Sequence, residues 1–474
     1  MATYDSVSPG LCLDLQQLEA QVQKGEPFLP ESLALWKALD SIKPRAITSA
    51  YLAWAYLADV FKHRGYDLYV PRKDTDTTFW TVVYPVNYIE DVKPEGGKPD
   101  RNVVLGPRRY VVPLFPYPAI WAATNQSGDE FILKVVSDGQ DPKGLAELRI
   151  LEHLDQPDLR THPPNRTVPV VEFVRHEQYT LAIFPRWTNF PEKEIRTPRS
   201  AIECCVQVTE SLAFLHEQRI AHLDISIENI MINFFGFVDP SLSPVVEYFP
   251  IAYGLIDFGE SVFLDASSSL APPRDYAPRP TSASEVSSGE PFDPFAADVY
   301  QTARFLLEQF YDLTGLDPEF LAILQAMTST PPSTRISMAE AHKRFAVMQT
   351  SWLRDPDADV IDIYGRRKNK YVDTYLNTWR PPPGMLSVPS NEEEARVLRE
   401  RMREDRKEEY GRVLSSHGSG MLWVDHVPGT IGCVDGNNPP ETLLAPLVDI
   451  ALRLFDKANA CTGESLVIHK RVDV

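Results

Sequence analysis

The stretch HLDISIEN at residues 222–229, followed by LIDFG at residues 255–259, decides how this sequence is interpreted. It places two carboxylates and one amide, those of Asp224, Asp257 and Asn229, in a fixed order along the chain. Carboxylate and carbonyl oxygens are ligands for Mg²⁺, and a carboxylate can also orient an attacking hydroxyl. Phosphoryl transfer requires both functions, since the metal ion neutralises charge on the phosphates and a carboxylate orients the attacking hydroxyl. The protein itself contributes little covalent chemistry.

The two stretches resemble the catalytic loop and the metal-binding loop of the eukaryotic protein kinase superfamily, whose usual forms are H-R-D-x-x-x-x-N and D-F-G. The resemblance implies that Asp224 is the catalytic base and that Asn229 and Asp257 are the metal ligands. It further implies that His222 and Phe258 are buried beneath these side chains. The flanking patterns agree with the family's order, since an apolar helical pattern precedes the first stretch and a short apolar strand follows it.

A second set of residues lies upstream, in a predicted strand at residues 131–136 that carries one lysine, Lys134. It is similar to the strand that holds the ATP-binding lysine of the family. In the helical pattern at residues 144–154, Glu147 is the expected partner of Lys134, and Glu152 is the alternative because only geometry can show which carboxylate faces the lysine. Leu148, Leu151 and Leu154 are expected to face inward. The resemblance assigns cofactor binding to Lys134, Phe184, Trp187, Asn229 and Asp257.

The second half of the sequence also follows the family's order. Residues 282–285, 298–300 and 332–336 resemble the end of the activation segment, the acidic start of a buried helix and the arginine turn. The resemblance implies that Glu285 pairs with Arg335. This pair would distinguish the protein-kinase branch from small-molecule kinases of the aminoglycoside or choline type. Those kinases share the residues that correspond to Asp224, Asn229 and Asp257.

We therefore expect an α+β, bilobal protein kinase-like fold, with a small β-rich N-lobe at residues 101–188 and a larger helical C-lobe at 189–352. Residues 1–100 are expected to form a flank of helices and strands that packs on the kinase lobe. Residues 353–474 are expected to form a C-terminal extension with a charged helix, which Asn391 caps.

Three departures from the family pattern concern the phosphate clamp, switching by loop phosphorylation, which is not expected here, and the stabilisation of the transition state. The glycine-rich loop is missing, and residues 113–123 carry three prolines instead, which remove amide donors and weaken the phosphate clamp. Leu223 stands where the family has an arginine that couples activation-loop phosphorylation to activity. Ser226 stands where Ser/Thr kinases have a lysine, so one source of transition-state electrostatics is lost.

Composition excludes several other classes of protein. The net charge of −19 repels nucleic acids and acidic membranes. No apolar run approaches the roughly 20 residues that span a bilayer, and no secretion signal is found. The five cysteines lack the spacing of a zinc site. We expect an intracellular protein, cytoplasmic or nuclear, with neither a nucleic-acid nor a membrane partner.

The sequence thus predicts an ATP-dependent protein kinase-like phosphotransferase that uses Mg²⁺ and transfers the γ-phosphate to Ser or Thr of a protein. The catalytic set is Asp224, Lys134 and Glu147, and the protein substrate is not indicated. The H-x-D-I-S form of the first stretch is similar to that of poorly characterised fungal kinase-like proteins. The alternatives are a pseudokinase that acts as a binding or scaffold module, and a small-molecule kinase.

Overall fold

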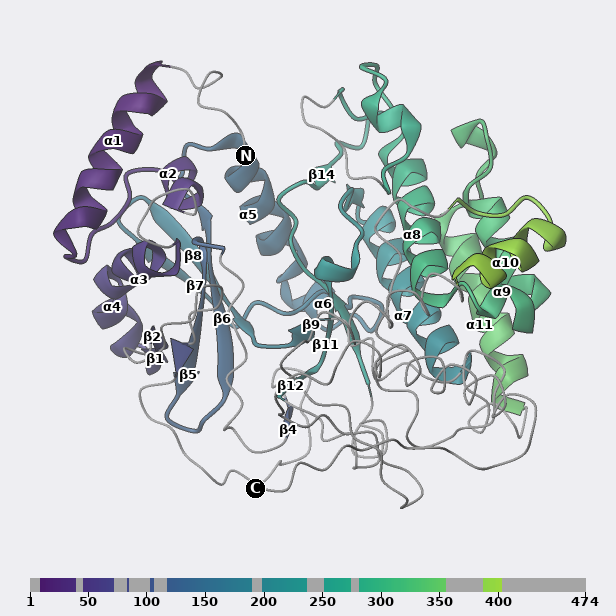
Figure 1. Cartoon of the computed structure of the whole chain (residues 1–474), viewed down its shortest axis with the longest axis horizontal. Coiled ribbons are helices and arrows are strands. Elements are labelled where there is room, and N and C mark those ends of the chain that lie inside the picture. Colours follow the sequence, from purple (N-terminus) through teal and green to yellow (C-terminus); the bar gives the residue numbers. More distant parts are fainter. Residues whose placement is uncertain are drawn as a thin grey trace, which may run out of the picture. The chain divides into compact units, whose positions relative to one another are not determined.

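The computed structural model describes residues 9–39, 46–71, 83–84, 103–105, 117–189, 198–236, 251–273, 281–354 and 387–402. They form a mixed α+β protein, which confirms the predicted class (Figure 1). The chain divides into two compact units. The first is drawn from Met1–Phe190 and Glu217–Ala266, and the second from Pro191–His216 and Ser267–Val474.

The first unit is built on a five-stranded antiparallel sheet with the strand order β1-β5-β6-β8-β7. In the three central strands, Lys134 of β6 lies between Ile120 of β5 and Ala182 of β8. Side chains alternate between the two faces, so Leu133 and Val135 project away from the face that carries Lys134. The strands are β1 (Tyr66–Leu68), β5 (Ile120–Asn125), β6 (Glu130–Ser137), β7 (Glu172–His176) and β8 (Tyr179–Pro185).

Four N-terminal helices cover the face of the sheet from which Leu133 and Val135 project (Figure 1). They are α1 (Pro9–Lys24), α2 (Leu33–Ala38), α3 (Ala46–Tyr56) and α4 (Ala58–Lys62). The edge of the Trp36 ring packs on Trp54, with ring centroids 5.2 Å apart, and Trp54 stacks on Trp121 of β5 at 6.4 Å. The N-terminal stretch also supplies strand β1, so it shares one hydrophobic core with the sheet.

Helix α5 (Pro142–Leu154) lies on the other side of the sheet and packs on β6 (Figure 1). Its start is encoded locally, because Asp141 accepts a hydrogen bond from the N–H of Gly144 at 2.8 Å and Pro142 occupies the first helical position. Of the residues expected to face inward, Leu151 and Leu154 are buried, whereas Ile150 takes the place of the half-buried Leu148. A short helix, α6 (Pro157–Arg160), follows.

The first unit also contains several short strands and a short 3-10 helix, which flank its loops. Two antiparallel sheets have the orders β13-β11-β9 and β10-β14, and two further pairs are β2-β3 and the parallel β4-β12. Their bounds are β2 (Val70–Pro71), β3 (Val83–Tyr84), β4 (Val103–Leu105), β9 (Thr188–Asn189), β10 (Ile220–Ala221), η3 (Ile227–Asn229), β11 (Ile230–Ile232), β12 (Phe234–Gly236), β13 (Tyr253–Leu255) and β14 (Val262–Phe263).

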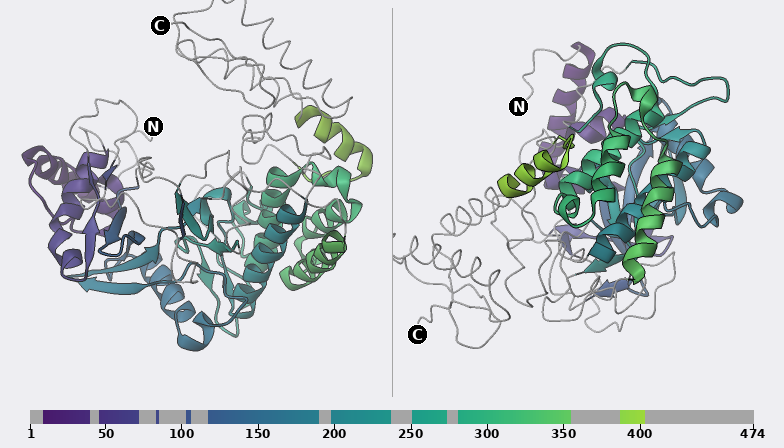
Figure 2. Two further views of the ribbon diagram at one scale, coloured as in Figure 1. Left: turned by 90° about the horizontal axis from the view of Figure 1, so that it is seen from below. Right: turned by 90° about the vertical axis from the view of Figure 1, so that its right-hand side faces the viewer.

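The second unit is helical (Figure 2). Helix α8 is buried along almost its whole length and begins at Pro294, one turn before Asp298, because Asp293 caps the N–H groups of Phe295 and Ala296. The elements are α7 (Pro198–Glu217), η5 (Ser284–Ser287), α8 (Pro294–Phe310), α9 (Leu313–Leu316), α10 (Pro318–Met327), η6 (Pro332–Thr334) and α11 (Met338–Arg354).

The charged C-terminal helix is described over 392–402 and starts as predicted, since Asn391 accepts from the N–H of Glu394 at 2.9 Å. Gln325 donates to the carbonyl of Pro389 at 2.8 Å, and Arg399 donates to Thr314 at 3.0 Å, so this segment docks on the second unit. The rest of the extension lies outside the described residues, as do residues 237–250. None of the helices described has the length and apolar character needed to cross a bilayer.

Candidate active site

The loop at residues 222–229 runs from β10 through η3 and brings Asp224 and Asn229 into direct contact. The side-chain amide of Asn229 donates to the carbonyl of Asp224 and to its carboxylate oxygen Oδ2, both at 2.8 Å. Both residues are buried, at 7% and 4% exposure. The amide nitrogen is thus committed to Asp224, which leaves the amide oxygen Oδ1 as the atom available to a cation.

Both loops contain a strained backbone position. Leu223 has a φ of 61° and Asp257 a φ of 64°, in the left-handed region that residues other than glycine rarely adopt. Such a conformation costs about 1–3 kcal/mol and is found preferentially at functional sites. In the first loop the strained residue is Leu223, directly before Asp224, and in the second it is Asp257 itself, so each strained position lies at a carboxylate of the candidate site.

Direct hydrogen bonds join the two loops to each other. The N–H of Ile256 donates to the carbonyl of Asn229 at 3.1 Å, next to the pairing of β11 with β13. Nε2 of His222 donates to the carbonyl of Ile256 at 2.9 Å, while Nδ1 accepts from the N–H of Asp224 at 3.3 Å. The His222 ring also packs on Phe258, with ring centroids 5.1 Å apart. His222 and Phe258 are buried, as the sequence predicted, and the loops form one structure.

Lys134 reaches this structure from the sheet and contacts two carboxylates. Its Nζ lies 2.6 Å from Oε1 of Glu147 and 2.8 Å from Oδ1 of Asp257. Glu152, the alternative partner, instead pairs with Arg175 at 3.0 Å on the surface. The pairing of Lys134 with Glu147 is therefore confirmed, and Asp257 is an additional partner that the sequence did not reveal.

The charges of this cluster depend on one another. Burial disfavours the charged form of Lys134, but Asp257 and Glu147 outweigh it and raise the pKa of the lysine. The positive charge of Lys134 lowers the pKa of Asp257 well below its usual value, against the opposing effect of burial. Burial is the main reason why the pKa of Glu147 is raised. Lys134 and Asp257 consequently stay ionised over the whole neutral range.

A second ion pair links α5 to the loop that carries Asp257. Nζ of Lys143, in the first turn of α5, lies 2.7 Å from Oε1 of Glu260, directly after Gly259. The Lys143 side chain is 55% exposed, so this pair contributes little to stability, although it adds a contact between the same two elements. Sequence reasoning missed it because charged residues at both positions are ordinary on a protein surface.

The two aromatic residues assigned to cofactor binding lie in different surroundings. Phe184 of β8 pairs with Ile132 of β6 and so lies on the same face of the sheet as Lys134. Trp187 instead supports β13, because a side chain at Gly254 would come within 2.6 Å of Cζ3 of the indole. Only glycine at position 254 allows this approach. Phe184 thus remains on the face that carries Lys134, and Trp187 has a packing role.

Asn229 and Asp257 each keep one side-chain oxygen that could hold a metal ion. Oδ1 of Asp257 contacts Lys134 and Gly259, so Oδ2 is left for a cation, and the side chain is 45% exposed. In the part of the chain that the structure describes, no cluster of three or more His, Cys, Asp or Glu side chains forms a metal cage. Mg²⁺ usually takes one or two protein ligands and completes its shell with waters and substrate phosphates.

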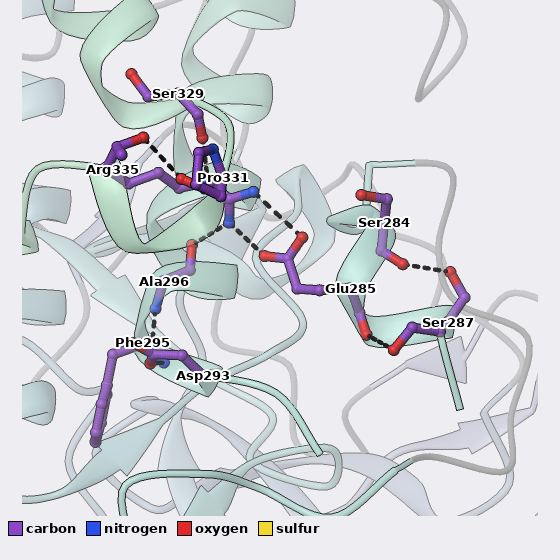
Figure 3. A network of polar contacts seen from close by, with 11 residues as sticks. Ser284, Glu285, Ser287, Asp293, Phe295, Ala296, Ser329, Pro331 and Arg335 are labelled. Atoms are coloured by element: carbon purple, nitrogen blue, oxygen red, sulfur yellow. Dashed lines mark hydrogen bonds and ion pairs between the residues drawn. The ribbon is translucent and has the colours of Figure 1, made fainter. Parts of the chain in front are cut away.

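In the second unit, Arg335 and Glu285 form the ion pair that the sequence predicted (Figure 3). Nη1 of Arg335 binds Oε1 of Glu285, and Nη2 binds Oε2 at 3.2 Å. The guanidinium also donates to the carbonyls of Ala296 at 2.9 Å and Ser329 at 3.1 Å, and lies 4.9 Å from the centre of the Tyr300 ring. Every edge of the guanidinium is used, so this arginine is a structural anchor.

Five of the predicted site residues are therefore brought into one connected structure in the first unit: Lys134, Glu147, Asp224, Asn229 and Asp257. In comparisons with known proteins, no protein-family model matches the chain and no curated protein is found to be similar to it. What the site does must be inferred from its own residues and their geometry.

Proposed function

We propose that the protein is an ATP- and Mg²⁺-dependent phosphotransferase of the protein-kinase type. The observation that carries this proposal is that Lys134 binds Asp257 while Ile256, the neighbour of Asp257, binds Asn229. A phosphate-binding cation, two metal-ligand candidates and a carboxylate are thereby held in one cluster. These are the parts that phosphoryl transfer requires.

Each residue has a role that follows from its contacts. Lys134, kept charged by its two carboxylates, would hold the α and β phosphates, and Glu147 would keep the lysine in place. Asn229 and Asp257 would bind Mg²⁺, which when bound neutralises charge on the phosphates. Asp224 would accept a hydrogen bond from the attacking hydroxyl, since Asn229 already fixes the orientation of its carboxylate.

Two features support the finer assignment to a bilobal protein kinase-like fold. The first unit contains an antiparallel sheet and the second is a set of helices, which supports a β-rich and a helical lobe. The two loops, which the sequence assigned to the C-lobe, belong to the first unit instead. The contact between Glu285 and Arg335 favours the protein-kinase branch over a small-molecule kinase, because this ion pair closes the activation segment of that branch. We infer that the acceptor is a Ser or Thr hydroxyl of a protein.

The main alternative is a pseudokinase. Residues 117–119 form a turn that leads into β5, where the family would have its glycine-rich loop, and this stretch has no glycine. The hydroxyl of Ser226 is buried without a hydrogen-bond partner, and it supplies no positive charge at the lysine position. The ordered contacts among Asp224, Asn229 and Asp257 weigh in favour of catalysis, because a scaffold would not need all of them.

The test combines binding with transfer. We expect Mg-ATP to raise the melting temperature of the wild-type protein, and the protein to transfer ³²P from γ-labelled ATP to a generic acceptor protein or to itself. Asp224→Asn should keep the melting shift but lose at least about 100-fold of the transfer rate, within the range for a general base. Asp158→Asn, at an exposed position of α6, is the matched control and should resemble wild type.

Each outcome has a definite meaning. Binding by the wild-type protein without transfer would support the pseudokinase, and the absence of both would contradict the whole assignment. Equal transfer by wild type and Asp224→Asn would show that the activity comes from another site or a contaminant. Transfer to an aminoglycoside or choline, but to no protein, would favour the small-molecule kinase.

A further inference from the structure

The turn that joins β6 to α5 is bonded to a segment 105 residues earlier in the chain. Oδ1 of Asp138 accepts from the N–H groups of Gln140 at 2.9 Å and Asp141 at 2.8 Å. Its other oxygen, Oδ2, accepts from the N–H of Leu33 at 2.8 Å. Leu33 is the first residue of α2, so this N–H is one that the helix itself cannot satisfy. Asp138 therefore ties the start of α2 to the start of α5.

The side chain of Leu33 makes the same connection by packing. A Cβ atom at Gly144, in the first turn of α5, would lie 2.9 Å from Cδ2 of Leu33 and 2.6 Å from the carbonyl oxygen of Val136. Such distances are shorter than real contacts allow, so α2, β6 and α5 meet at this glycine without space for a side chain. Leu33 itself is 2% exposed.

The segment that carries α2 is in turn fixed to the sheet. The hydroxyl of Tyr179, at the start of β8, donates to the carbonyl of Pro30. The edge of the Trp36 ring faces Tyr179, with centroids 6.2 Å apart, and Trp36 is fully buried. Tyr179 of the sheet thus contacts the chain before Leu33, at Pro30, and after it, at Trp36. These two contacts fix α2 to the sheet, so α2 can act as a rigid support.

The supported helix carries Glu147, which lies three residues after Gly144 and binds Lys134. The positive charge of Lys37 in α2 also acts on Glu147, where it is one of the effects that lower its pKa and oppose the raising effect of burial. A shift of α5 at Gly144 would move the carboxylate of Glu147 relative to the lysine.

We propose that α2 is a positioning element for the Lys134–Glu147 pair: by binding Asp138 and packing on Gly144, it fixes α5 so that the pair forms within this chain alone. Neither a partner protein nor a phosphorylation is needed to bring Glu147 to the lysine. The catalytic importance of this pair rests on the proposed function, but its positioning by α2 does not.

The test removes the Leu33 N–H while keeping α2. Leu33→Pro has no N–H, yet proline is favoured at the first position of a helix, and Ser32 before it has φ −150° and ψ 162°, which proline accepts. Leu33→Ala loses the same apolar side chain but keeps the N–H, so it is the matched control. Asp138→Asn is the second variant, because its amide would present a donor to the Leu33 N–H, with Asp158→Asn as control.

Two measurements report on α5 without requiring activity. The first is the rate at which an amine-acetylating reagent labels Lys134 at pH 9, relative to the exposed Lys62, followed by mass spectrometry. If Glu147 moves away, Nζ of Lys134 loses one of its two ion-pair partners and becomes more accessible to the reagent. The second is hydrogen exchange of the α5 amides. We expect faster labelling and faster exchange in Leu33→Pro than in Leu33→Ala, and in Asp138→Asn than in its control.

Equal labelling of Lys134 and equal exchange of α5 in both pairs of variants would overturn the proposal. Faster exchange throughout the protein, rather than in α5, would also overturn it, because α2 would then be a general stabiliser. If both readouts respond while the wild-type protein neither binds Mg-ATP nor transfers phosphate, α2 still positions α5, and it is the proposed function that fails.

Discussion

The backbone N–H of Ile256 donates to the carbonyl of Asn229 at 3.1 Å, so the residue before Asp257 is bonded to the last residue of η3. Two segments that are far apart in sequence thereby present Asp257 and Asn229 from adjoining backbone. The side chain of His222 strengthens this connection by donating to the carbonyl of Ile256 at 2.9 Å. The relative position of Asp257 and Asn229 is therefore set by a main-chain bond and by the His222 side chain.

Replacing Asn229 separates its two roles. Asn229→Ala removes the amide oxygen, whereas Asn229→Asp keeps an oxygen but replaces the donor to Asp224 by a second carboxylate. We expect Asn229→Asp to lower the transfer rate, because the hydrogen bond that orients the Asp224 carboxylate is replaced by a like charge. Asn229→Ala should instead raise the Mg²⁺ concentration needed for transfer.

A matched control is Asn391→Asp, since Asn391 caps the helix over 392–402 and aspartate caps equally well. Its rate and its Mg²⁺ requirement should equal those of wild type. An unchanged transfer rate in Asn229→Asp would mean that the bond from Asn229 does not orient a group that acts in transfer.

Lys134 and Lys143 both bind carboxylates of the same loop, but only the first is in a buried cluster. Lys134→Met leaves Glu147, at 8% side-chain exposure, without its cation, and we expect a loss of about 3 kcal/mol of unfolding free energy. Lys143→Met should cost less than about 1 kcal/mol, because its partner remains solvated. Urea unfolding, followed by tryptophan fluorescence, measures both, and similar losses in the two variants would contradict this assignment.

The sequence predicted those parts of the site that are encoded in short motifs. Asp224, Asn229 and Asp257 lie in two short stretches that resemble the family's loops, and Lys134 lies in an apolar stretch that resembles the family's lysine strand. Glu147 could not be separated from Glu152 by pattern alone. The choice depends on which side of α5 faces β6. Leu148 was expected to face inward but is only half-buried, so the sequence pattern placed that side of the helix slightly wrongly.

Long-range contacts were beyond the reach of sequence reasoning. Strand β1 pairs with β5 although about fifty residues separate them, and no local signal identifies such a partner. The bond from Leu33 to Asp138 is of the same kind. The helical stretch from Ala46 to Lys62 is interrupted at Leu57, whose N–H donates to the carbonyl of Trp54, and no local signal in the sequence marks this break. The break lets both Trp54 and Phe61 pack into the core.

The pH dependence of the Lys134 cluster can be stated with its sign. The pKa of Lys134 is raised in the folded protein above the ordinary value of 10.5. A group with a raised pKa contributes stability that is fully present below its unfolded value and is lost as pH rises through the folded value. The difference in unfolding free energy between wild type and Lys134→Met should thus be constant from pH 8 to 10 and shrink at higher pH. A difference that shrinks already at pH 9 would show that the lysine is not held charged by its carboxylates.

The second unit offers a prediction that does not depend on the proposed activity. Arg335 is 3% exposed in its side chain and binds both oxygens of Glu285 and two backbone carbonyls. Lysine cannot reproduce this planar fork, so we expect Arg335→Lys to lose about 2–4 kcal/mol of stability. Arg344→Lys is the matched control, because Arg344 also binds a glutamate, Glu319, through two nitrogens, but at 26% and 50% exposure.

The control should lose less than about 1 kcal/mol, because an exposed pair gains little over its hydrated state. Hydrogen exchange of the α8 amides localises the effect, since Arg335 bonds the carbonyl of Ala296 in the first turn of that helix. Exchange should accelerate in α8 of Arg335→Lys and stay unchanged in Arg344→Lys. If lysine at 335 left both the stability and the exchange of α8 intact, the ion pair with Glu285 would not be the anchor of this turn, and the case for a protein kinase over a small-molecule kinase would lose its main structural support.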